Sequence, residues 1–180
     1  MKILKEVYRE LEEYFIGDCE EERGAFLSKD QAGIICDFIP DEHGSRDSFS
    51  FYPSADVLLE ASNRWKEKGF ELSGIVHSHP KGKNGKLSSG DLLFGKKFFD
   101  LNPHINELYL PVFFDNELFV YRLFRTKSGI TTVPEELLYL DYEYPEEPSI
   151  TKPDLKEYYE DGEAEINFVI EGEIDGQLRL

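Results

Sequence analysis

The sequence of 180 residues is poor in cysteine, with only Cys19 and Cys36. Two cysteines imply no disulfide framework, and free thiols suit the reducing cytoplasm. No apolar run approaches the ~20 residues that a membrane-spanning helix needs. Charged residues interrupt the first 15 positions throughout, unlike the apolar core of a secretory signal peptide. We therefore expect a cytoplasmic protein that does not work in or on a membrane.

Basic residues are also scarce, because 20 Lys and Arg stand against 37 Asp and Glu. The resulting formal net charge of −17 would repel phosphate groups, so the composition argues against a nucleic acid partner. The length allows one domain with a substantial core and is too short for two comfortable ones.

The stretch from residue 74 to residue 91 carries the strongest chemical signal. An apolar run delivers His77 and His79, and residues two apart on a strand point to the same face. Pro80 stops the strand, a polar loop follows, and Ser88 and Asp91 begin a new helix. Two His and one Asp form a three-ligand zinc set with one open position, which is typical of catalytic sites. Taken singly, a His-x-His pair is often only structural, and Ser-x-x-Asp also reads as a plain helix start.

In this order, His-x-His-Pro, a short loop and Ser-x-x-Asp resemble the JAMM motif of the JAB/MPN zinc metalloproteases. The likeness is to small bacterial JAB-domain isopeptidases that resemble deubiquitinases. It implies a Zn²⁺ ion held by His77, His79 and Asp91. It also implies that the Ser88 hydroxyl stabilises the oxyanion of the tetrahedral intermediate.

The same resemblance requires an upstream Glu as general base, between the first helix and the first strand. Glu22 fits this register, because a small residue and an apolar strand follow it at the expected spacing. Glu20 and Glu21 are close competitors, and a solvated acidic helix end is their alternative interpretation.

Periodicity predicts three helices and a set of short strands. The first helix carries an apolar stripe at Ile3, Val7, Leu11 and Phe15, and Gly17 and Asp18 end it. The other helices are expected at 55–68 and 91–100, and the strands at 24–28, 33–38, 48–52, 71–79, 107–114, 118–125 and 130–133. This order predicts an α/β fold, an α/β/α sandwich with a mixed central sheet. It agrees with the JAB/MPN type of fold, which is related to that of cytidine deaminases.

We expect the JAB/MPN metalloprotease domain to span residues 1–133. Residues 134–180 would form an acidic C-terminal extension, because they are dense in Glu, Asp, Tyr and Pro. Apolar residues alternate around 166–170, so this extension would end in a strand able to pair with a sheet edge.

The family resemblance implies a zinc-dependent isopeptidase or peptidase that cleaves after the C-terminal tail of a ubiquitin-like protein. Its partners would be that protein or its conjugate, together with activating and conjugating enzymes. The pathway would be a bacterial ubiquitin-like one, either in antiphage defence or in sulfur-carrier processing. The alternative is a non-catalytic MPN scaffold; such relatives typically lose zinc ligands, whereas this chain keeps the whole set. A deaminase-like zinc hydrolase is disfavoured, because the sequence has no Cys-x-x-Cys pair.

Overall fold

A computed structural model describes residues 1–16, 22–46 and 51–141. Its helices are α1 Lys5–Phe15, α2 Ala55–Glu67 and α3 Ser89–Leu101. Its strands are β1 Lys2–Leu4, β2 Gly24–Lys29, β3 Ile34–Pro40, β4 Ser45–Arg46, β5 Phe51–Tyr52, β6 Glu71–Ser78, β7 Glu107–Tyr109, β8 Val112–Phe114, β9 Glu117–Thr126, β10 Gly129–Glu135 and β11 Leu138–Leu140.

Within these ranges, nine strands form one mixed sheet. Its main order is β10-β9-β7-β6-β2-β3-β1-β11, and β8 continues alongside β6 and β9 where β7 has ended. The β6 pairing with β2 is antiparallel, whereas its pairings with β7 and β8 are parallel. The predicted α/β fold with a mixed central sheet is thus confirmed.

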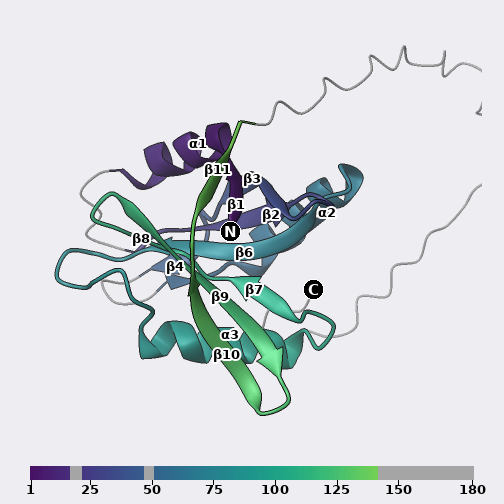
Figure 1. Cartoon of the computed structure of the whole chain (residues 1–180), viewed down its shortest axis with the longest axis vertical. Helices are drawn as coiled ribbons and strands as arrows, with labels where there is room; N and C mark the ends of the chain where they lie inside the picture. Colours follow the sequence, from purple (N-terminus) through teal and green to yellow (C-terminus); the bar gives the residue numbers. More distant parts are fainter. Residues whose placement is uncertain (17–21, 47–50, 142–180) are drawn as a thin grey trace, which may run out of the picture.

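Alternating side chains of the central strands divide the core into two layers. In β2 and β6, Ala25, Leu27 and Val76 belong to the cluster that includes α1, and Phe26 and Ile75 to the cluster that includes α2 and α3. Helix α1 therefore covers one face of the sheet, and α2 and α3 cover the other. Figure 1 shows α1 and α3 on opposite sides of β6.

Local signals in the sequence explain where α2 starts and stops. The Ser54 side chain accepts a hydrogen bond from the backbone N–H of Val57, 3.4 Å away, and so caps the first turn. Gly69, just past the last turn, has a φ of +72°, a left-handed conformation that glycine adopts without steric cost. The observed helix agrees with the one expected at 55–68 to within one residue.

The two ends of the described chain differ from the sequence prediction. Lys2–Leu4 form a strand rather than the first turn of the helix. This strand pairs in parallel with both β3 and β11, so it lies inside the sheet. The sheet also continues past residue 133, through β10 and β11 to Leu140. The remainder of the acidic extension, including the strand expected around 166–170, lies outside the described residues.

The strand expected at 107–114 is divided in two. Pro111 has no N–H to give to a neighbouring strand, and it separates β7 from β8. Because of this break, β7 meets β6 at Gly74 and β8 meets it at His77. Of the strand expected at 48–52, the structure describes only Phe51–Tyr52.

Candidate metal centre

The two histidines lie at the C-terminal end of β6, held by strands on both sides. His77 is in register with Gly24 of β2, and its backbone N–H donates to the carbonyl of Pro111 at 3.1 Å. The backbone N–H of His79 donates to the carbonyl of Phe113 at 3.0 Å. Both imidazoles are buried. Since Ile75 packs against α2 and α3, the same alternation turns His77 and His79 towards α3.

Asp91 reaches the histidines from the first turn of α3. The Ser88 hydroxyl accepts from the backbone N–H of Asp91 at 3.2 Å, and Asp91 Oδ2 accepts from the backbone N–H of Ser88 at 2.6 Å. This reciprocal pair is a capping box that fixes the carboxylate. The motif therefore starts a helix and also places a carboxylate beside the two imidazoles. In the described structure the Ser88 oxygen serves as a helix cap, and its oxyanion role stays a prediction.

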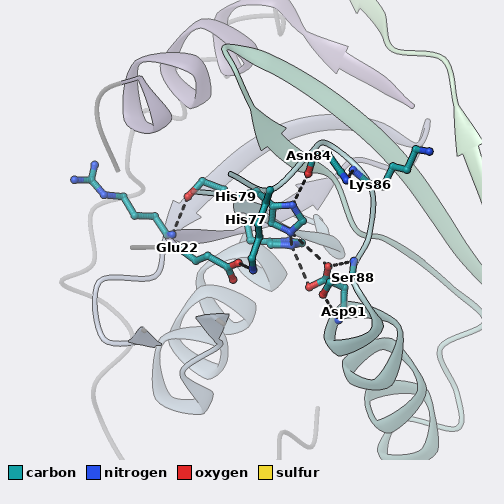
Figure 2. Close-up of polar contacts among 10 residues, drawn as sticks. Glu22, His77, His79, Asn84, Lys86, Ser88 and Asp91 are labelled. Atoms are coloured by element: carbon teal, nitrogen blue, oxygen red, sulfur yellow. Dashed lines mark hydrogen bonds and ion pairs between the residues drawn. The ribbon is translucent and has the colours of Figure 1, made fainter. Parts of the chain in front are cut away.

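Three possible ligand atoms converge at this point (Figure 2). His77 Nε2 lies 3.2 Å from His79 Nε2 and 3.2 Å from Asp91 Oδ1. His79 Nε2 lies 3.5 Å from Asp91 Oδ2. In a tetrahedral zinc site with bonds of about 2.0–2.1 Å, two ligand atoms are roughly 3.3–3.4 Å apart. Each pair of side chains thus has two atoms at about this separation, with Oδ1 of Asp91 near His77 and Oδ2 near His79.

A hydrogen bond to the loop after β6 orients His79. Its Nδ1 lies 2.6 Å from the backbone carbonyl oxygen of Asn84, which can only accept, so Nδ1 carries the proton. The lone pair of Nε2 is then directed at the other two ligand atoms. A carbonyl behind a ligand histidine is a usual feature of metal sites. The residues present therefore fit a zinc ion.

Electrostatics also favour a cation here. Burial by itself would raise the pKa of Asp91, but its contacts with the imidazoles of His77 and His79 and the hydrogen bond from the Ser88 backbone hold that pKa well below its usual range. Burial would lower the pKa of His79, yet the Asp91 carboxylate, the Asn84 carbonyl and the charge of Glu22 together raise it. The carboxylate is therefore ionised, and the site stabilises positive charge next to it.

Glu22 is tied to the histidine strand through its neighbour. The backbone N–H of Arg23 donates to Ser78 Oγ at 2.9 Å, and the Ser78 N–H donates to the Arg23 carbonyl at 2.8 Å. Ser78 lies between His77 and His79 in the chain, so these two hydrogen bonds bring Glu22 beside the site. The Glu22 side chain is only 2% exposed, and Figure 2 shows it directed towards the imidazoles.

The structure thus brings together all five residues that the sequence singled out: Glu22, His77, His79, Ser88 and Asp91. Glu20 and Glu21 lie outside the described residues. Three contributors were missed, namely Ser78, Lys83 and Asn84. Lys83 donates a hydrogen bond to Glu22 Oε1. Asn84 acts through its backbone carbonyl, which no sequence pattern marks, and Lys83 belongs to a polar loop in which lysine usually faces solvent.

A cleft of about 530 Å³ opens beside the site. Its lining includes the backbone or side chains of Phe15, Ser78, His79, Gly82 and Phe113. Of the candidate site residues, the lining includes only His79.

Comparisons with known proteins give a likeness of fold. No family model matches the chain, and no curated protein matches it. Among solved structures, protein DSY2949 from Desulfitobacterium hafniense is similar with a TM-score of 0.57 and 17% sequence identity, over 78% of this chain and 93% of that one. AF2198, a JAB1/MPN domain protein from Archaeoglobus fulgidus, is similar with a TM-score of 0.45 and 17% identity, over 78% of this chain and 97% of that one. In the described ranges, no helix has the length and apolar character to cross a membrane.

Proposed function

We propose that this chain is a zinc-dependent peptidase of the JAMM type. The observation that supports this most is the convergence of His77, His79 and Asp91 beside the buried carboxylate of Glu22. Three neutral or anionic ligands leave a fourth position open, as catalytic zinc sites do. A buried acid beside these ligands supports a general base at this place.

The roles of the side chains follow from their places. His77, His79 and Asp91 would hold the zinc ion, which when bound supplies Lewis acidity and makes water a nucleophile near neutral pH. The Glu22 carboxylate would take the proton of the attacking water and pass it to the leaving amine. The Ser88 hydroxyl, which accepts from the backbone of Asp91, keeps its own proton to donate to a developing oxyanion.

The non-catalytic scaffold is less well supported than the enzyme. A scaffold does not need an ionised carboxylate between two buried imidazoles, and burying such groups costs stability unless they are paired. It also does not need a second buried acid at the same place. Both are present here.

For the substrate, we propose the C-terminal tail of a ubiquitin-like protein, cleaved from a conjugate or a precursor. A flexible, extended tail could reach ligands that lie at the end of a strand and below the protein surface. The pathway would be a bacterial ubiquitin-like one, in antiphage defence or in sulfur-carrier processing.

The test is cleavage of a ubiquitin-like protein fused through its C-terminus to a reporter protein. Zinc-loaded protein should release the reporter at the junction, whereas chelation or the Glu22→Gln variant should abolish release. Hydrolysis of short unrelated peptides without cleavage of any fusion would instead indicate a general peptidase. If zinc-loaded protein cleaves neither the fusion nor the peptides, the result would contradict the proposed peptidase activity and favour a non-catalytic scaffold.

A further inference from the structure

The ion pair between Lys83 and Glu22 joins two distant parts of the chain at the candidate site. Lys83 Nζ donates to Glu22 Oε1, and the two side chains are 24% and 2% exposed. A carboxylate this deeply buried is unfavourable unless a partner compensates its charge. Lys83 provides that compensation from the loop that follows His79.

The loop that carries Lys83 is anchored at neighbouring residues. The backbone N–H of Lys83 donates to the Pro80 carbonyl at 3.2 Å, which forms a turn. The hydroxyl of Tyr121 on β9 donates to the Gly85 carbonyl at 3.0 Å. Gly85 also lies so close to the Phe119 ring that a Cβ would clash with it. The position of Lys83 is therefore built by the fold on both sides.

Consecutive residues of this loop serve the two halves of the site. Lys83 contacts Glu22, and the next residue, Asn84, accepts the hydrogen bond of His79 Nδ1. One short segment therefore orients both the candidate base and one candidate ligand.

We propose that Lys83 is the positioning residue of the general base: its ammonium group pairs with the Glu22 carboxylate and holds it in the orientation that faces the site. This inference rests on the proposed function. Lys83 touches neither metal nor substrate in this role; it acts through Glu22.

The charges around Glu22 explain why a cation is required. A buried carboxylate needs a partner of opposite charge, and the adjacent ammonium is one. The charge of Glu22 also interacts with the imidazole of His79. Arg23 does not take this role, since its guanidinium points to the Tyr14 carbonyl, 3.5 Å away.

The first test is the steady-state kinetics of cleavage of a fusion substrate. In Lys83→Met, kcat should fall by roughly tenfold or more while KM changes little, because a base that leaves its productive position slows the chemical step without removing a substrate contact. Lys83→Arg should restore most of kcat. Lys86→Met is the matched control, an exposed lysine of the same loop whose backbone N–H alone contacts Asn84. An unchanged kcat in Lys83→Met, or an equal fall in Lys86→Met, would overturn the proposal.

A second test needs no activity and no metal. Midpoints of thermal unfolding are measured for zinc-free wild type, Glu22→Gln, Lys83→Met and the double variant. The unfolding midpoint of the double variant should fall clearly less than the sum of the falls in the two single variants, because either change already breaks the ion pair. Additive falls of the midpoint would contradict an ion pair between Lys83 and Glu22. If the zinc-loaded wild type cleaves no substrate, the proposed function is wrong. The comparison of these four proteins still shows whether Lys83 pairs with Glu22.

Discussion

Replacing Ser78 by Ala should separate Glu22 from the metal centre without touching a candidate ligand. Ser78 is 3% exposed, and its Oγ accepts the backbone N–H of Arg23 at 2.9 Å. In Ser78→Ala this N–H loses its acceptor at a partly buried position. Leaving a buried donor unpaired costs about 1–3 kcal/mol of unfolding free energy.

For a protein of this size, that cost corresponds to roughly 2–4 °C in the unfolding midpoint per kcal/mol. We therefore expect the midpoint to fall by between ~2 and ~12 °C in a thermal scan. Because Arg23 follows Glu22 directly, kcat/KM should fall as well, while the zinc content stays that of the wild type.

Ser73→Ala on the same strand is the matched control. Ser73 is buried too, but its Oγ has no hydrogen-bond partner among the residues that the structure describes. Removing an unpaired hydroxyl should leave the midpoint unchanged or raise it. If Ser78→Ala is as stable and as active as Ser73→Ala, the bond between Ser78 and Arg23 does not position Glu22.

Three further predictions follow from single residues. Gly74→Ala should lower the unfolding free energy by about 1–3 kcal/mol in denaturant titrations, since its Cβ would lie 2.5 Å from a backbone carbonyl of β7; an unchanged midpoint would contradict the close packing of β6 and β7. Burial raises the pKa of the Cys36 thiol to about 11, so in a Cys19→Ser background it should stay protonated and react slowly with iodoacetamide at pH 9. Reaction at the rate of an unfolded control, or no acceleration as the pH approaches 11, would contradict this. Glu22→Gln should abolish peptidase activity and keep zinc, whereas Glu21→Gln should be nearly silent; the reverse result would move the base by one position.

The sequence was sufficient for the candidate ligands because their placement depends on local periodicity. Residues two apart on a strand point to the same face of the sheet, so the sequence predicts that His77 and His79 point in the same direction. The third residue after a capping serine lies in the first turn of a helix, so the sequence predicts Asp91 at the start of α3. The family resemblance, which requires an acid before the first apolar strand, pointed to Glu22, and the pairing of β2 with β6 brings it to the histidines.

The features that were missed depend on contacts between distant segments. Lys2–Leu4 was predicted as the start of a helix, because Ile3 continues the apolar stripe of that helix. Pairing with β3 and β11 makes this segment a strand instead. The strands beyond residue 133 were not predicted, because the acidic composition of that region indicated an extension outside the sheet. Lys83 and Asn84 look like ordinary loop residues, and their roles depend on where Glu22 and His79 lie in space.

His77, His79 and Asp91 together form the proposed metal site. Its most direct test is elemental analysis of protein that has been incubated with zinc and dialysed, for the wild type and for a His77→Ala, His79→Ala double variant of unchanged circular dichroism. We expect about one zinc ion per wild-type chain and almost none in the double variant. A double variant that keeps the full zinc content of the wild type would contradict it.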